Sequence, residues 1–259
     1  MKKIANKFFL FIFLLNSQIT LAQHARFATE GTIEFEKSVN MHAQIKKQIN
    51  KNNESYYLPA LDQYKKSQPQ FKVMKSVLSF SKTKTLYTPI IEQTPTRTMF
   101  SELPAANQNN IIYTDLATNQ STAQKNIFEE LFLVTDSTRK IKWKLTSETR
   151  DIAGYNCRRA NALVMDSVYV VAFYTDEIPV SGGPESFTGL PGMILGVALP
   201  HENITWFAKI VNDKALPAGT IVPPKKGKVT TSAGLLSTLK NALKNWGEYA
   251  QMQVKNYLL

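Results

Sequence analysis

In the stretch Thr32-Ile33-Glu34-Phe35-Glu36-Lys37, apolar and charged residues alternate. Ile33 and Phe35 share one side with the later Val39. Successive side chains of a β-strand point to opposite faces, so this pattern predicts a strand with one buried face and one wet face. The folded part of the chain therefore begins as β structure.

Segments of similar character recur along the chain. We expect further strands at 71–81, 83–87, 110–116, 126–135, 140–149, 155–165, 168–175, 193–199 and 204–211. This spacing is typical of meandering antiparallel β structure. Residues 40–70 interrupt the pattern because they are rich in Lys, Gln and Asn, and they predict an inserted polar helix or a long loop.

The first residues have the pattern of an export signal. Lys2, Lys3 and Lys7 precede the apolar run 8–15, and the segment Thr20-Leu21-Ala22 follows with small residues at the expected cleavage positions. This order predicts a signal peptide over residues 1–22, cleaved near Ala22-Gln23. We expect the mature protein to be periplasmic or outer-membrane-associated.

The formal net charge of +11 is unevenly distributed. Residues 1–22 carry three lysines and no acid, residues 23–213 carry 21 basic and 19 acidic groups, and residues 214–259 carry seven basic groups and one acidic group. The main body is therefore nearly neutral and lacks the basic surface expected of a nucleic-acid-binding protein. We predict no nucleic-acid partner.

The basic C-terminal part, residues 214–259, combines a Pro- and Lys-rich linker with an amphipathic pattern. Apolar residues recur at spacings of three and four up to about Val254, and Thr230 or Ser232 is expected to cap the helix. The helix either packs on the same β domain, 23–213, or lies on an anionic membrane surface. Lys240, Lys244 and Trp246 are the candidate membrane contacts.

Residues 178–199 are unusually rich in Gly and Pro. Glycine permits positive φ and proline fixes φ, so Gly189-Leu190-Pro191-Gly192 predicts a rigid turn that leads into the apolar strand 193–199. The turn is either a structural corner of the sheet or a recognition loop at the mouth of a cavity. The candidate ligand- or partner-binding residues are Pro184, Phe187, Gly189, Leu190, Pro191 and Gly192.

This segment resembles the GLPGLI family of secreted Bacteroidetes proteins. The motif stands here as Gly-Leu-Pro-Gly-Met-Ile at 189–194, and the segments 151–160 and 171–179 also look like the family pattern. Met193 replaces the usual leucine, a volume-conserving change. The resemblance covers about residues 139–211 and implies no established activity. It implies a layout similar to the open, curved β-sheets of periplasmic lipoprotein carriers, which hold acyl chains in a hydrophobic hollow.

The expected fold is therefore mainly β, of the α+β type. We predict a curved antiparallel sheet or open half-barrel over residues 23–213, with an insertion at 40–70 and a C-terminal helix packed on the same domain.

Chemistry-bearing residues form no recognisable catalytic or metal-binding set. Ser181 and Ser186 lie outside a Gly-x-Ser-x-Gly motif, and the histidines at 24, 42 and 201 are far apart in the sequence. No phosphate loop or dinucleotide fingerprint is present. We expect no catalytic residue, no metal and no cofactor.

The sequence thus favours a non-enzymatic cell-envelope binding protein that holds an apolar, lipid-like ligand or a segment of an outer-membrane protein. One alternative is an assembly partner of an outer-membrane complex with no small ligand, and a hydrolase ranks third. The concave face of the sheet distinguishes the first two, since a carrier needs free space there.

Overall fold

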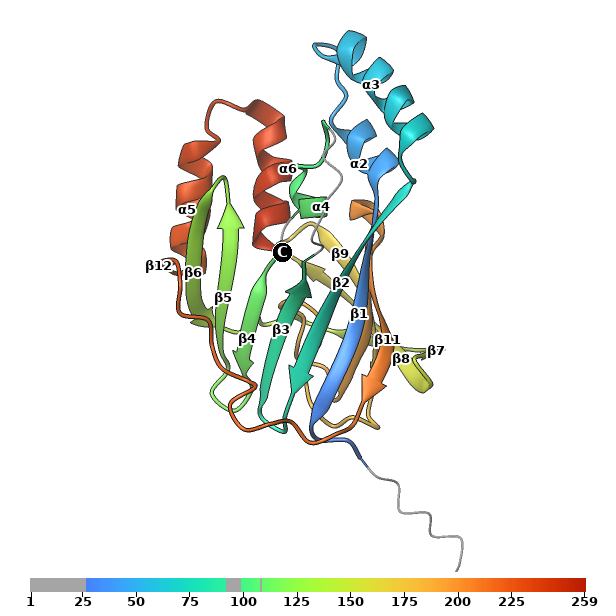
Figure 1. Cartoon of the computed structure of the whole chain (residues 1–259), viewed down its shortest axis with the longest axis vertical. Helices are drawn as coiled ribbons and strands as arrows, with labels where there is room; N and C mark the ends of the chain where they lie inside the picture. The colour runs from blue at the N-terminus through green and yellow to red at the C-terminus, as the bar shows by residue number, and fades with distance from the viewer. Residues whose placement is uncertain (1–26, 92–98, 108) are drawn as a thin grey trace, which may run out of the picture.

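The computed structural model describes residues 27–91, 99–107 and 109–259, so the predicted signal peptide lies outside the described residues (Figure 1). Within these residues, twelve strands form one open sheet, in the order β12-β6-β5-β4-β3-β2-β1-β11-β10-β9-β8-β7. Figure 1 shows the sheet curving around the end of helix α6. This confirms the predicted fold class of a mainly β protein with a curved, open sheet and a C-terminal helix.

The strands have the following bounds: β1 (Gly31–Asn40), β2 (Phe71–Phe80), β3 (Lys84–Ile90), β4 (Ile111–Asp115), β5 (Gln120–Ile127), β6 (Glu130–Ser137), β7 (Lys144–Ile152), β8 (Tyr155–Val164), β9 (Val168–Thr175), β10 (Met193–Leu199), β11 (Ile204–Asn212) and β12 (Lys228–Thr230). The helices are α2 (Met41–Lys47), α3 (Glu54–Ser67), α4 (Pro104–Asn107), α5 (Ser232–Ala242) and α6 (Gly247–Leu258), and a short 3-10 helix, η2 (Pro200–Glu202), joins β10 to β11.

Strand β1 is the centre of the sheet. It pairs antiparallel with β2 on one side and with β11 on the other. Its buried positions alternate with half-buried ones along all ten residues, as the sequence predicts. Ile33, Phe35, Lys37 and Val39 are buried on its concave face, where the core lies.

Strand β12 makes the sheet mixed rather than purely antiparallel. Its three residues pair in parallel with Phe132–Val134 of β6, whereas the other strand pairs in the described sheet are antiparallel. Three residues are too few to show a period-two pattern, so the sequence predicts no strand here.

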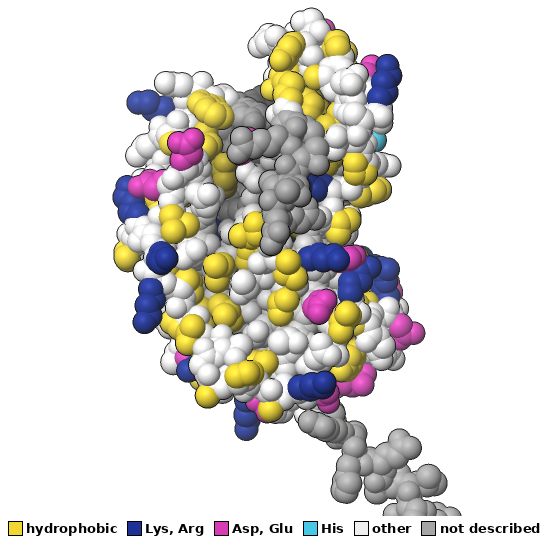
Figure 2. Space-filling model, in the orientation of Figure 1, with side chains coloured by type: hydrophobic (Ala, Val, Ile, Leu, Met, Phe, Trp, Pro, Cys, Tyr) yellow, Lys and Arg dark blue, Asp and Glu magenta, His cyan; other side chains and the backbone are white. Residues whose placement is uncertain are grey.

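The insertion at 40–70 forms the helices α2 and α3. The Asn40 side chain caps α2 by accepting a hydrogen bond from the backbone N–H of Ala43. Figure 1 shows α3 projecting beyond the ends of β1 and β2, and Figure 2 shows hydrophobic side chains on the surface at this end of the molecule. The side chains of Leu61 and Tyr64 on α3 are buried. The centroid of the Tyr64 ring lies 5.9 Å from that of the Phe100 ring.

The C-terminal part forms two helices, α5 and α6, where the sequence predicts one. The break falls at 243–246, and Gly247 has a φ of +57°, in the left-handed region that favours glycine. The N-cap of α5 is Thr231, whose side chain accepts a hydrogen bond from the backbone N–H of Gly234. The predicted caps, Thr230 and Ser232, are therefore wrong by one residue. Among the described helices, none has the length and apolarity needed to cross a membrane.

Candidate functional site

The Gly- and Pro-rich loop between β9 and β10 buries its two large apolar side chains, Phe187 and Leu190, in the core. Phe187 is fully buried and its ring meets the Trp206 ring edge-on at 6.1 Å, while Leu190 is only 2 % exposed. The predicted apolar contacts of a recognition loop are therefore unavailable on the surface. The reason is that the loop turns inward and covers the concave face of the sheet.

Hydrogen bonds hold this loop in place. Ser181 Oγ accepts from the backbone N–H of Gly189 at 3.1 Å, and Trp143 Nε1 donates to the carbonyl oxygen of Thr188 at 2.9 Å. Gly189 has a φ of +93°, and at Gly192 an added Cβ would lie 2.1 Å from the carbonyl oxygen of Thr175. Both glycines are thus required by backbone geometry.

The remaining members of the predicted loop site are divided between the core and the surface. Pro184 and Gly192 are buried, whereas Gly189 and Pro191 are exposed. The structure therefore does not bring the six residues together as one accessible surface.

The predicted membrane contacts lie on the outside of α5 and in the turn that follows it. Lys240 and Lys244 are exposed, and Trp246 is 47 % exposed. The Trp246 ring meets the Phe128 ring at a centroid distance of 6.2 Å. These residues do not line the cavity described next.

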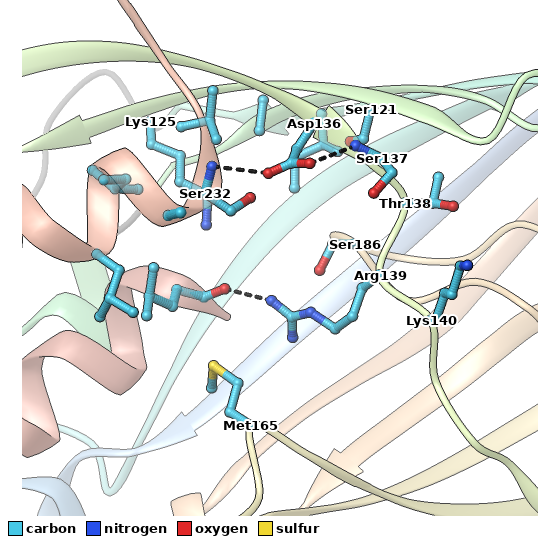
Figure 3. Close-up of a pocket in the computed structure, with 17 residues that line it drawn as sticks. Ser121, Lys125, Asp136, Ser137, Thr138, Arg139, Lys140, Met165, Ser186 and Ser232 are labelled. Atoms are coloured by element: carbon cyan, nitrogen blue, oxygen red, sulfur yellow. Dashed lines mark hydrogen bonds between the residues drawn. The ribbon is translucent and has the colours of Figure 1, made fainter.

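A cavity of about 470 Å³ lies inside the curve of the sheet, between β5, β6 and the two C-terminal helices (Figure 3). Its apolar lining comes from Ile112, Ala123, Val134, Met165, Ala233, Leu235, Leu236 and Leu258. Its polar lining comes from Ser121, Lys125, Asp136, Ser137, Thr138, Arg139, Lys140, Ser186 and Ser232. The volume is within the range of about 300–1,000 Å³ that is typical of ligand pockets.

Three side chains bind successive main-chain oxygens at the end of α6 and in the residue that follows it. Lys125 Nζ donates to the carbonyl oxygen of Tyr257 at 2.9 Å, and Arg139 Nη2 donates to that of Leu258 at 2.6 Å. Ser186 Oγ donates to the main-chain oxygen of Leu259, which is part of the terminal carboxylate, at 3.3 Å. The last carbonyls of a helix lack intrahelical partners and carry partial negative charge, so the two cations stabilise this end of α6.

The cavity wall holds one buried cation, Lys125, and one half-buried cation, Arg139. Burial lowers the pKa of Lys125 to about 8, against the opposing effect of Glu185, and the nearby Arg139 and Lys37 lower it further. Burial also lowers the pKa of Arg139. The Arg139 Nη1 atom is buried and has no hydrogen-bond partner within the described part of the chain.

Asp136 supplies the acidic group of the cavity wall. Its Oδ2 accepts from the backbone N–H of Ser232 at 3.1 Å, and its Oδ1 accepts from that of Ser137 at 2.8 Å. These hydrogen bonds lower the pKa of the carboxyl group. Figure 3 shows that the hydrogen bond from Ser232 ties β6 to the start of α5.

A second polar group lies deeper in the hollow. Asn110 Nδ2 donates to Glu185 Oε2 at 3.0 Å, and Lys37 Nζ lies 5.1 Å from the centre of the Trp206 ring. Burial lowers the pKa of Lys37, which Glu185 opposes. Lys37 and Lys125 thus both lie near the carboxylate of Glu185 inside the sheet.

Groups suited to catalysis or metal binding are scattered. Within the described residues, no three or more His, Cys, Asp and Glu side chains cluster as a metal site. Cys157 is buried, and burial, with the nearby Glu177 and Asp151, raises the pKa of its thiol to about 12. His201 lies on the outside, with its ring 6.3 Å from that of Tyr169.

The fold and this cavity define a class of protein: a curved, open β-sheet whose hollow is partly filled by its own C-terminal helices. The sequence matches the model of a protein family described as a protein of unknown function (Porph_ging), over residues 163–196 only. The matched segment runs from the end of β8 through the Gly- and Pro-rich loop into β10. No curated protein matches the sequence.

Two solved structures of PNGF-II resemble the fold. The structure in the C2 space group has a TM-score of 0.50 and 17 % sequence identity, over 83 % of this chain and 33 % of the other. The structure in the P21 space group has a TM-score of 0.48 and 19 % identity, over 84 % and 34 % of the two chains. This chain thus spans about a third of the length of those proteins, and the likeness concerns the fold alone.

Proposed function

We propose that this chain is a non-enzymatic cell-envelope binding protein, which holds an apolar ligand in the cavity between β5, β6, α5 and α6. The observation that carries the proposal is the cavity itself, whose volume of about 470 Å³ and largely apolar wall suit a small molecule. The export pattern of residues 1–22 and the resemblance of 189–194 to the secreted GLPGLI family support a place in the envelope.

The size of the cavity limits the ligand. Helices α5 and α6 and the Gly- and Pro-rich loop occupy part of the hollow that a lipoprotein carrier would leave free for several acyl chains. The remaining space fits one small molecule or one short hydrocarbon chain. We therefore favour a small ligand over a protein-borne lipid anchor with several chains.

The direct test is to purify the protein from the envelope of its own cells and analyse it by native mass spectrometry. We expect an additional mass that organic solvent extracts. Recovery of the protein without any bound molecule, in repeated preparations, would contradict the proposal.

A blocking variant links that mass to the cavity. Ala233 lines the cavity near the exposed start of α5, so Ala233→Trp should fill the cavity and remove the bound molecule. Ser237→Trp is the matched control, since it is exposed on the same helix and outside the cavity. If both variants retain the mass equally, the ligand is bound elsewhere.

A second candidate, an assembly partner in the envelope, is favoured by the projecting helix α3. Tyr56 is 65 % exposed and Leu58 is also exposed, although both are apolar enough to be buried at an interface. Crosslinking from Tyr56 in intact cells tests this role. Capture of one outer-membrane protein by wild type, lost in Leu58→Asp, would support it.

A further inference from the structure

We infer that the cavity binds an uncharged single-chain amphiphile, whose alkyl chain enters first and whose hydroxyl-type headgroup stays at the mouth. This inference rests on the proposed function and names the chemical class of its ligand. It is drawn from the charges of the cavity lining, the place of its hydroxyl groups and the burial of its apolar side chains.

The two cations inside the cavity already have partners. Lys125 and Arg139 each donate to a main-chain oxygen at the end of α6. The carboxylate of Glu185 lies near Lys125, and the terminal carboxylate of Leu259 lies at the same end of α6 as those oxygens. An ionic headgroup inside the cavity would therefore lose its hydration without gaining a counter-ion, which costs much free energy.

The other two charged groups of the lining have opposite signs and lie nearer to solvent. Asp136 is half-buried and Lys140 is exposed. The two carboxylate oxygens of Asp136 accept hydrogen bonds from the backbone N–H groups of Ser137 and Ser232, which favour its ionised form. One negative and one positive charge thus offset each other at the mouth, so it favours neither sign of headgroup.

Hydroxyl groups are the remaining polar groups at this mouth. Ser137 and Ser232 are exposed, and Ser121 and Thr138 are half-buried. Ser121 is the pairing partner of Asp136 between β5 and β6, and Figure 3 shows Ser121 and Ser137 on the same side of the cavity as Asp136. A hydroxyl group both donates and accepts a hydrogen bond, so this set suits an uncharged headgroup such as an alcohol.

The apolar lining lies deeper than these hydroxyl groups. Ile112, Ala123, Val134 and Leu235 all line the cavity and are buried, and they come from β4, β5, β6 and α5. The cavity is therefore polar where it meets solvent and apolar inside. An alkyl chain gains most when it fills the inner part, because there it leaves water completely.

Isothermal titration calorimetry with decanol, decanoate and decyltrimethylammonium tests the inference on the purified protein. These probes share one alkyl chain and differ in the charge of the headgroup. We expect decanol to bind at least about tenfold more tightly than either ion, because an ion loses hydration without a counter-ion. Equal or tighter binding of one ion would overturn the inference but leave the proposed apolar site intact. If none of the three binds, the proposed function itself is wrong.

A series of alcohols from hexanol to decanol tests the place of the chain. Each CH₂ group that becomes buried should raise the affinity about fourfold. An affinity that does not rise with chain length would show that the chain stays outside the apolar part, and would overturn the inference.

Substitutions at the mouth test the balance of its two charges. Asp136→Asn leaves Lys140 in excess and should raise the affinity for decanoate relative to decanol by at least about threefold. Lys140→Gln should raise the relative affinity for decyltrimethylammonium instead, and it keeps the test valid if Asp136→Asn does not fold, since Lys140 is exposed. Asp176→Asn is the matched control, an exposed carboxylate outside the cavity lining. Unchanged ratios in the folded mouth variants would overturn the placement of the headgroup.

Discussion

At the residue scale, the position of Leu190 determines how the Gly- and Pro-rich loop should respond to mutation. Its side chain is 2 % exposed and packed in the main core cluster. Leu190→Asp places a carboxylate there without a partner, which should cost several kcal/mol of unfolding free energy. For a chain of this size, each kcal/mol lowers the melting temperature by about 2–4 °C.

Thermal unfolding followed by circular dichroism measures this effect. Pro191→Ala is the control, because the neighbouring Pro191 is exposed. A melting temperature that Leu190→Asp leaves unchanged would show that the loop can leave the core at little cost.

Lys125 should make stability depend on pH. Its pKa is about 8 in the folded protein, mainly because of burial, against an ordinary value of 10.5. Between these values the unfolded chain binds more protons than the folded one, so the free energy of unfolding rises with pH through this window. The difference of 2.5 pKa units (10.5 minus 8) corresponds to a gain on the order of 3 kcal/mol.

Urea unfolding between pH 8 and pH 10.5 tests this effect against Lys125→Met. The methionine variant should lack the gain, since it has no proton to lose at this position. Lys140→Met, which removes an exposed lysine, should keep the slope of the wild type. Parallel slopes for wild type and Lys125→Met would contradict the expected role of burial.

At the element scale, the alternation of apolar and polar residues was sufficient to predict most strands. It failed where a turn is made by residue types that are unusual in turns. Strands β9 and β10 have the predicted bounds, but the predicted strand 126–135 joins parts of β5 and β6. The turn between them uses Phe128 and Glu129 with φ of +51° and +71°, a conformation that these residue types rarely adopt. No Gly, Pro or Asn marks the reversal.

The cavity was not predicted from the sequence, partly because the boundary between β5 and β6 was placed wrongly. Lys125 faces inward with Ala123 and Ile127, which only the register of β5 against β6 makes visible. Arg139 lies in the connection between β6 and β7, where no periodic pattern exists. The glycines and the proline at 189–192 correctly predicted a rigid turn. A local pattern of this kind cannot predict which distant residues Leu190 packs against.

The outer surface of α5 carries the remaining prediction of a membrane contact. Lys240 and Lys244 are exposed, and Trp246, which follows them in the sequence, is 47 % exposed. Each basic residue near an anionic membrane contributes about 1 kcal/mol. Replacing both lysines with glutamate should therefore lower the affinity for phosphatidylglycerol vesicles by at least about tenfold, with little change in melting temperature.

Vesicle cosedimentation measures that affinity. The matched control, Lys65→Glu with Lys66→Glu, makes the same charge change in exposed residues of α3. An equal loss in the control would show that net charge, rather than the α5 surface, governs binding.

At the scale of the whole molecule, the charge of +11 separates into parts with different roles. The predicted signal peptide and the C-terminal part contribute +3 and +6 of it, by the count of basic minus acidic residues. The nearly neutral body nevertheless places Lys37, Lys125 and Arg139 inside the curve of its sheet. Net charge therefore describes the inside of the sheet poorly, because these cations lie within a body that is nearly neutral.

The arrangement of the elements also predicts an order of local stability. Strand β1 has paired neighbours on both sides and one fully buried face, whereas α3 projects from the sheet and buries only Leu61 and Tyr64. Local opening costs least where few apolar contacts are lost. In native-state hydrogen exchange, we expect the amides of 33–39 to be the slowest, with those of 56–66 at least about a hundredfold faster.

Exchange measured by mass spectrometry on peptides from these two segments tests that order. Leu61→Ala should speed exchange in α3 further and leave β1 unchanged, because the two segments open separately. Equal protection of α3 and β1 would mean that the helix and the sheet unfold as one cooperative unit. The projecting helix would then be a fixed part of the core rather than a separately opening arm.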